Sequence, residues 1–272
     1  MFGGAPLPQQ APVEERLHPT RLLRRAFEIR GQVARATLRM TARGLYQVFI
    51  DGATVSDAVL LPGFTSYHKD LRYQEFDVTT FLAEPGEHVW ATELADDWWA
   101  GRVAVQGQSA QWGDRLQLLG ELEVEYADGS REVVGTDGSF VSSPGSRMYA
   151  DIQIGEKRDL RLEQEGWQLS GFDEAAWTSV AVTDEVPGED GPAILPQEAP
   201  LARVQAMLAP IAWWHEDDAI VVDFGQVIAG RVALECLLGK GQELVLRHAE
   251  ALDADGRFFE NIVGRKCLPN VK

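Results

Sequence analysis

The stretch GLYQVFIDGATV (residues 44–55) decides the fold class. Its Asp51-Gly52 pair stands between two apolar runs, which is the strongest short-range signal of a β-hairpin. On either side the chain continues in short runs such as ARATLRMTA and LQLLGELEVEY, where apolar and polar residues alternate as in half-buried strands. Asp128-Gly129 predicts a second hairpin turn. Helical periodicity is nearly lacking, so we predict an all-β protein, a jelly-roll-like sandwich followed by a second, incomplete β-sandwich.

The composition limits the classes of partner. The chain has 272 residues, with 42 acidic and 25 basic side chains and a formal net charge of -17. Such an acidic chain offers no basic stripe to neutralise phosphates, which excludes nucleic acid, and anionic membrane surfaces are equally unsuitable partners. The length allows one large or two ordinary domains, and a hydrophobic content of 45% supports a buried core. The balance fits a soluble protein that handles neutral or cationic ligands.

Targeting signals and cysteine frameworks are not evident. The stretch MFGGAPLPQQAPVEERLHPT has no apolar core of a secretory signal, and no run of about 18 apolar residues predicts a membrane span. Cys236 and Cys267 are too few for a disulfide framework and do not have metal-ligand spacing. We therefore expect a cytoplasmic protein.

Changes in composition divide the chain into four segments. Residues 1–19 are rich in Pro, Gly and Gln and predict a flexible tail. The alternating runs of residues 20–182 predict the first sandwich. Residues 183–199 lie in the Pro-, Gly- and acid-rich stretch TDEVPGEDGPAILPQEAP and predict a linker. Residues 200–272 carry a second set of strands, but about 70 residues are few for an independent sandwich, so we expect a truncated module.

Several stretches resemble the non-catalytic N-terminal part of bacterial α-L-rhamnosidases. GLYQVFIDGATVSDAVLLPGFTSYHKDLRYQEFDVTTFL, DDWWAGR and MYADIQIGEKRDLR resemble the N-terminal sandwich of that family, which is galactose-binding-like. VVDFGQVIAGRVALECLLGKGQELVLRHAEALDADGRFFEN resembles the second sandwich. The matching stretches follow the order of the family and cover most of residues 20–266. The resemblance implies a substrate class, terminal L-rhamnose on plant or microbial glycans and glycosides.

The same resemblance indicates where catalysis would reside. In the family an α/α barrel follows the two sandwiches and carries the acidic catalytic residues, but these 272 residues contain neither its motif nor a long helical stretch. An inverting glycosidase needs two carboxyl groups about 6.5–9.5 Å apart across the scissile bond. Since no acid here matches a catalytic position of the family, we assign no catalytic residue and expect this chain alone to be inactive.

The stretch ADDWWAGR (residues 95–102) concentrates the chemistry of sugar recognition in what we expect to be a loop at a strand end. A flat aromatic face suits the C–H side of a sugar ring, and charged groups form strong, directional hydrogen bonds with vicinal hydroxyls. The N-terminal sandwich of the family is similar to a calcium-dependent rhamnose-binding module, and adjacent carboxylates suit Ca²⁺. Family members often carry Asp-Gly or Asp-Asn where Asp96-Asp97 stand. The candidate sugar ligands are Asp96, Asp97, Trp98, Trp99 and Arg102, and the candidate calcium ligands are Asp96 and Asp97.

The stretch GEKRDLR (residues 155–161) resembles the Gly-Glu-x-x-Asp-Ala-Arg pattern of the family and adds Glu156 and Asp159 as candidate sugar ligands on a polar rim. Both stretches also have a plainer interpretation. The two tryptophans would plug the end of the core, and the charged side chains would form exposed ion pairs worth little energy. Since successive strand residues point to opposite faces, we expect at most one of the two tryptophans to stack on a sugar.

The expected function is the accessory, carbohydrate-recognising part of an α-L-rhamnosidase, with a rhamnose-containing glycan or glycoside as partner. No cofactor is certain, and calcium is the candidate. Two alternatives stay open. In one, the chain is a fragment of an intact glycoside hydrolase that cleaves terminal α-L-rhamnosides. In the other, the modules only brace a catalytic domain, and the second unit exposes an apolar patch that this domain or a second copy of the chain covers.

Overall fold

The computed structural model describes residues 18–103, 109–183 and 191–259, and almost all of its regular structure is β. The all-β fold class that the sequence predicts is therefore confirmed. The chain divides into two compact units, residues 1–203 and 204–272. No helix in the described part of the chain is long and apolar enough to cross a membrane.

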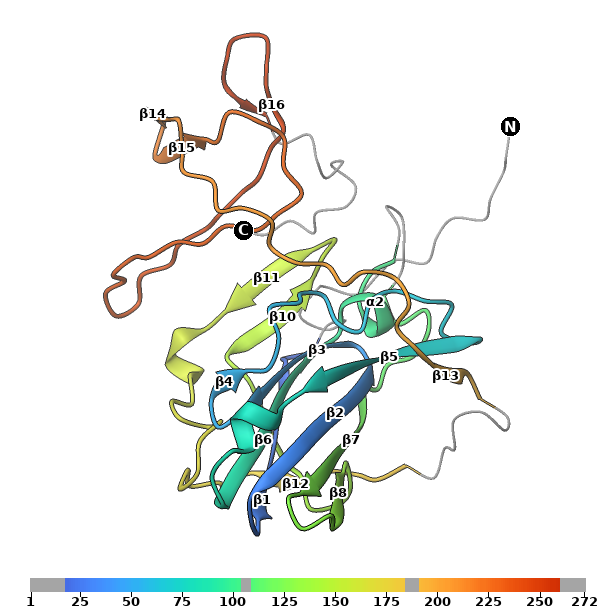
Figure 1. The fold of residues 1–272 in the computed structure, drawn as a ribbon. Helices are drawn as coiled ribbons and strands as arrows, with labels where there is room; N and C mark the ends of the chain where they lie inside the picture. The colour runs from blue at the N-terminus through green and yellow to red at the C-terminus, as the bar shows by residue number, and fades with distance from the viewer. Residues whose placement is uncertain (1–17, 104–108, 184–190, 260–272) are drawn as a thin grey trace. The chain divides into compact units, whose positions relative to one another are not determined.

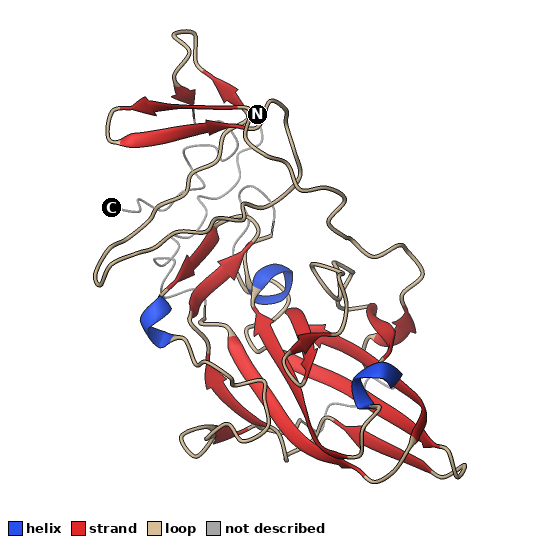
Figure 2. Cartoon of the chain, turned by 60° about the vertical axis from the view of Figure 1, so that its left-hand side comes forward, coloured by secondary structure: helices blue, strands red, loops and turns tan. Residues whose placement is uncertain are grey.

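The first unit contains a six-stranded sheet in which β1 and β6 lie at the centre (Figures 1 and 2). All strand pairs in this sheet are antiparallel. In spatial order, its strands are β12 (Thr178–Ser179), β9 (Val141–Pro144), β1 (Arg21–Ile29), β6 (Gly86–Ala95), β3 (Leu45–Ile50) and β4 (Ala53–Thr54).

A five-stranded sheet forms the opposite layer, and β2 lies at its centre. One edge strand, β13, pairs in parallel with β5, whereas the other pairs are antiparallel. Part of the segment that the sequence assigns to a linker thus belongs to this sheet. In spatial order, its strands are β13 (Ala193–Pro196), β5 (Asp70–Asp77), β2 (Val33–Arg43), β7 (Gln117–Tyr126) and β8 (Arg131–Gly135).

The main core lies between the two sheets. Alternate residues of the central strands enter it, as the pattern ARATLRMTA predicts, and the side chains of Leu38, Trp90 and Leu122 are fully buried there. Burying a side chain of this size stabilises the fold by about 1.5–3 kcal/mol. A smaller cluster covers the outer face of the six-stranded sheet, where Trp167 packs edge-on against Phe49 at 5.9 Å between ring centroids.

Both hairpin turns predicted from Asp-Gly pairs are confirmed. Asp51 and Gly52 connect β3 to β4 with φ values of 49° and 79°, the left-handed backbone that a two-residue hairpin turn requires. Asp51 also accepts a hydrogen bond from the Val89 N–H at 2.7 Å, which ties the turn to β6. Asp128 and Gly129 lie between β7 and β8.

Short elements complete the first unit. The hairpin of β10 (Arg147–Asp151) and β11 (Gly155–Arg158) forms a separate two-stranded sheet. GEKRDLR, which the sequence predicts to form a polar rim, is therefore a strand followed by a short 3-10 turn. The remaining elements are η1 (Thr79–Leu82), α2 (Asp97–Ala100) and η2 (Leu160–Leu162).

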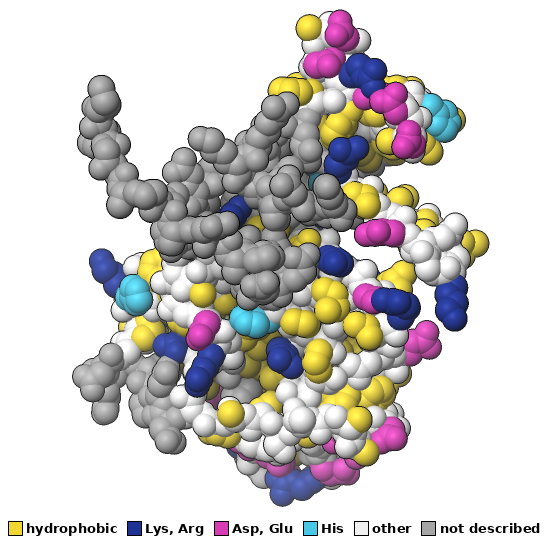
Figure 3. Space-filling view, turned by 180° about the vertical axis from the view of Figure 1, so that it is seen from behind, with side chains coloured by type: hydrophobic (Ala, Val, Ile, Leu, Met, Phe, Trp, Pro, Cys, Tyr) yellow, Lys and Arg dark blue, Asp and Glu magenta, His cyan; other side chains and the backbone are white. Residues whose placement is uncertain are grey.

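The second unit contains two small antiparallel hairpins, β14 (Ala212–Glu216) with β15 (Ala219–Asp223) and β16 (Ala251–Leu252) with β17 (Phe258–Phe259). Apolar side chains lie on the protein surface among acidic and basic ones (Figure 3). Large exposed apolar side chains of this unit include Met207, Ile211, Trp213, Ile220 and Leu237. The bracing alternative expects such exposure, because a unit of this size buries few of its apolar groups by itself.

Candidate functional site

Two consecutive carboxylates are buried where β6 ends. Asp96 is 1% and Asp97 is 2% exposed, and they open the single helical turn of α2. The turn replaces the expected loop because the Asp96 carbonyl accepts hydrogen bonds from the N–H groups of Trp99 and Ala100, at 3.2 and 3.1 Å. Asp97 has a φ of 27°, close to the left-handed region that Gly, Asn and Asp enter more readily than other residues.

A third buried carboxylate, which the sequence analysis did not select, completes this group. Asp151 ends β10, and its Oδ2 accepts a hydrogen bond from the Arg102 N–H at 2.6 Å. The N–H of Ile152 in turn donates to Asp97 Oδ1 at 3.3 Å. Two hydrogen bonds from backbone N–H groups to carboxylates thus connect the β10–β11 turn to the segment of α2. We call Asp96, Asp97 and Asp151 the carboxylate cluster.

Gly101 allows the carboxylate cluster to close. A Cβ atom added at Gly101 would lie 2.3 Å from Asp151 Oδ2 and 2.3 Å from the Asp97 carbonyl oxygen. Both distances are far below van der Waals contact, and one of the atoms belongs to the backbone. Position 101 in ADDWWAGR therefore requires a glycine, because any side chain there would clash with Asp151 and with the Asp97 backbone.

Burial sets the electrostatics of the carboxylate cluster. It raises the pKa of Asp97 to about 7, the hydrogen bond from Ile152 opposes this rise, and the charges of Asp151 and Asp96 add to it. Burial also raises the pKa of Asp96, against the contacts of that carboxylate with His18. An ionised carboxylate is costly in such surroundings unless a positive charge or further donors accompany it. The carboxylate cluster is thus a place where added positive charge or donors would be favourable.

His18 contacts Asp96 directly. Its N–H donates to Asp96 Oδ2 at 2.7 Å, and its ring Nδ1 lies 3.2 Å from both carboxylate oxygens. About half of the His18 side chain is exposed. The segment that precedes β1 therefore supplies the donors to this carboxylate.

The two tryptophans of α2 point to different surroundings. Trp99 is buried, donates from Nε1 to the Arg115 carbonyl at 2.9 Å, and has the Arg43 guanidinium 5.0 Å from its ring centroid. Trp98 is only half-buried and faces the exposed ring of Phe64. Trp99 thus packs in a small apolar cluster with Tyr67 and Leu71, separate from the main core, and Trp98 is the more exposed tryptophan of the pair.

The other three candidates lie in different positions relative to the carboxylate cluster. Arg102 is buried and joins it through its backbone N–H. Glu156 on β11 forms an ion pair with Arg147 at 3.2 Å. Asp159 pairs with Arg161, which lowers the pKa of Asp159 to about 2. The structure therefore engages Glu156 and Asp159 with arginines, as the plainer interpretation of GEKRDLR expects.

The carboxylate cluster has the donor chemistry of a hard-cation site, since such ions take oxygen ligands. In the arrangement observed, N–H groups and His18 already engage oxygens of all three carboxylates. Within the described ranges, no three His, Cys, Asp or Glu side chains converge as metal ligands. A cation bound here would therefore have to replace donors that are now in place.

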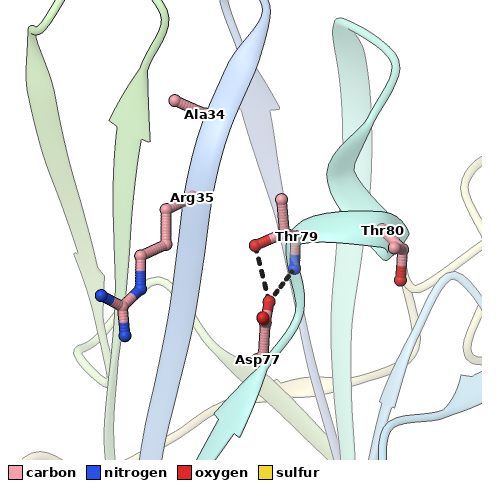
Figure 4. A pocket seen from close by; sticks show the side chains of 5 residues that line it. All are labelled: Ala34, Arg35, Asp77, Thr79 and Thr80. Atoms are coloured by element: carbon pink, nitrogen blue, oxygen red, sulfur yellow. Dashed lines mark hydrogen bonds between the residues drawn. The ribbon is translucent and has the colours of Figure 1, made fainter.

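A separate shallow cavity near the end of β5 has a structural role. It has a volume of about 670 Å³ and is lined by Ala34, Arg35, Asp77, Thr79 and Thr80 (Figure 4). Asp77 accepts hydrogen bonds from the N–H and Oγ1 of Thr79, at 3.0 and 2.6 Å, and these lower the pKa of Asp77. The polar groups of this cavity are thus used to start η1.

Family comparisons agree with this architecture. Residues 31–205, more than half of the chain, match the model of the alpha-L-rhamnosidase N-terminal domain. The chain belongs to this family. Residues 215–269 match the bacterial alpha-L-rhamnosidase concanavalin-like domain, so the family resemblance of the sequence is confirmed in both units.

Individual relatives of this rhamnosidase N-terminal region are much longer than the chain. An alpha-L-rhamnosidase from Streptomyces avermitilis is 36% identical over 265 residues, which are 95% of this chain and 24% of the relative. One from Formosa agariphila is 31% identical and matches 89% of this chain and 26% of its own length. The chain thus spans about a quarter of these relatives.

Solved structures of rhamnosidases share the fold. The Streptomyces avermitilis alpha-L-rhamnosidase complexed with L-rhamnose aligns with a TM-score of 0.79 and 34% identity, over 89% of this chain and 23% of that chain. The native enzyme from Aspergillus terreus aligns with a TM-score of 0.73 and 31% identity, over 77% of this chain and 24% of that chain.

Proposed function

We propose that this chain recognises terminal L-rhamnose of a glycan or glycoside at the carboxylate cluster beside Trp98. The observation that carries the proposal is a half-buried tryptophan on the same helical turn as the buried Asp97. An aromatic face covers the apolar side of a sugar, and carboxylates are strong acceptors for its hydroxyl groups. L-rhamnose is also the named ligand of the Streptomyces avermitilis neighbour, which supports the choice of sugar.

The electrostatics of the carboxylate cluster add support. Burial disfavours the charged form of Asp97. Groups held in such an unfavourable environment occur most often at functional sites. Sugar hydroxyls would supply further hydrogen-bond donors to the ionised carboxylates, in addition to the N–H groups that the protein provides.

Calcium is the companion ion that we propose for this site. Asp96 and Asp97 would hold it, and its positive charge would keep Asp97 ionised at neutral pH and attract hydroxyl oxygens of the sugar. Because His18 already occupies Asp96, binding of the ion would release His18 from that carboxylate.

Trp98→Ala is expected to weaken L-rhamnose binding about tenfold, since it removes the aromatic face from the site. Equilibrium titration of the full chain with L-rhamnose measures the affinity. Trp213→Ala is the matched control, because Trp213 is an exposed tryptophan of the second unit. Equal affinity of Trp98→Ala and the native chain would exclude Trp98 from the site.

A further inference from the structure

A groove extends from Trp98 along the surface of the first unit. Its volume is about 530 Å³, within the range of small-molecule sites. It is lined by residues 59–65, by Asp70 and Arg72 of β5, and by residues 197–202. None of the sugar candidates from the sequence except Trp98 lies in its lining.

Backbone pairing fixes both walls of the groove. β13 runs parallel to the start of β5 (Figure 1), and the Gln197 N–H that follows β13 donates to the Tyr73 carbonyl of β5 at 2.9 Å. On the other side, the Val59 N–H donates to the Ala202 carbonyl at 2.9 Å, and Arg203 forms an ion pair with Asp57 at 2.7 Å. The groove is therefore bounded by hydrogen-bonded segments.

An exposed aromatic ring is held rigidly in this groove. Phe64 is 52% exposed, yet its ring packs edge-on against three others. Its centroid lies 6.1 Å from that of Trp98, 5.8 Å from that of Tyr67 and 6.3 Å from that of Trp112. Orientation by three neighbours reduces the entropy that Phe64 would lose on binding a ligand. The exposed face of Phe64 is therefore available to a ligand in the groove.

One basic and two acidic side chains line the groove, Arg72 with Asp70 and Glu198, so the charge of the lining is net negative. Arg72 donates to Asp70 Oδ2 at 3.0 Å and to the Pro196 carbonyl at 3.1 Å, and about a quarter of the Arg72 and of the Asp70 side chain is exposed. This net negative charge disfavours anionic ligands. The exposed oxygens and N–H groups of the lining still exchange hydrogen bonds with hydroxyls. Aromatic surface combined with such groups suits a neutral sugar ring.

We infer that this groove binds the neutral sugar residue to which the terminal rhamnose is linked. The inference rests on the proposed recognition of rhamnose, because Trp98 lines the groove and is also assigned to the proposed rhamnose site. A rhamnose at the carboxylate cluster would direct its linked sugar along Trp98 toward Phe64. The chain would then select rhamnosylated saccharides over free rhamnose.

The test compares L-rhamnose with a neutral rhamnosyl-glucose disaccharide as titrants of the full chain. We expect the native chain to bind the disaccharide about fivefold more tightly than L-rhamnose. Phe64→Ala should lose this gain and keep the affinity for L-rhamnose. Phe259→Ala is the matched control, since Phe259 is also 52% exposed but lies in the second unit, and it should keep the gain.

Each contrary outcome has a distinct meaning. Equal affinity of the native chain for both titrants overturns the groove inference and leaves rhamnose recognition intact. An equal loss of both affinities in Phe64→Ala, with an unchanged melting temperature, also overturns it, because Phe64 would then belong to the rhamnose site. If neither titrant binds the native chain, the proposed function fails together with the inference.

Discussion

Asp97→Asn is expected to raise the free energy of unfolding at pH 8 by about 2 kcal/mol. The folded-state pKa of Asp97 is about 7, well above the value of about 4 for an unfolded chain. Between these values the folded state holds a proton that the unfolded state has lost, so the stability contribution falls as the pH rises from 4 to 7 and stays low above 7. Asn carries no charge and tolerates a φ of 27° at least as well as Asp does.

Urea unfolding of both chains at pH 4 and pH 8, in calcium-free buffer, measures this effect. The two stabilities should be similar at pH 4, where Asp97 is protonated in the folded state. The advantage of Asn should appear at pH 8. Asp159→Asn provides the control, because the pKa of Asp159 is lowered by Arg161 and its loss should not stabilise the fold at pH 8. A destabilised Asp97→Asn chain at pH 8 would show that burial of the Asp97 charge is not costly.

Gly101→Ala is expected to lower the free energy of unfolding by about 3 kcal/mol. The added methyl group would meet Asp151 Oδ2 and the Asp97 carbonyl at 2.3 Å, so either α2 or the β10–β11 turn must shift. The shift would also separate the members of the carboxylate cluster. We therefore expect Gly101→Ala to lose L-rhamnose binding at a temperature where the variant is still folded.

Thermal unfolding followed by circular dichroism measures the stability of Gly101→Ala. Gly138→Ala is the matched control, because a Cβ at Gly138 would meet its nearest neighbour, Val182, at an ordinary 3.7 Å. If Gly101→Ala has the same melting temperature as the native chain, α2 does not pack closely against Asp151.

Local features of the chain were predictable from sequence because their causes are local. The Asp51-Gly52 and Asp128-Gly129 turns depend on backbone preferences of two residues, and alternation along each strand reveals its buried face. In ADDWWAGR the residue types indicated sugar chemistry. Their geometry depended on the helical hydrogen bonds of α2, which strand alternation does not describe.

Contacts between residues that lie far apart along the chain could not be predicted from the sequence. Asp151 lies near enough to affect the charge of Asp97 because β10 packs against α2. Its position before the turn in MYADIQIGE is a weak sign of a capping carboxylate, since it accepts a hydrogen bond from the Ile154 N–H. Glu156 was selected by pattern, but its ion pair with Arg147 depends on the register of β10 and β11. The groove could not be predicted from the sequence either. Part of its lining comes from the Pro-rich stretch after β13, and the position of that stretch depends on the parallel pairing of β13 with β5.

The most direct test of the account is calorimetric titration of the full 272-residue chain with L-rhamnose, in calcium and again in EDTA. We expect saturable binding heat in calcium and an affinity about tenfold lower in EDTA, because Asp96 and Asp97 would lose the cation that supports the sugar. Equal affinity in both buffers would show that calcium has no part in sugar binding at this site. Absence of binding heat in both buffers would show that the carboxylate cluster beside Trp98 does not recognise L-rhamnose.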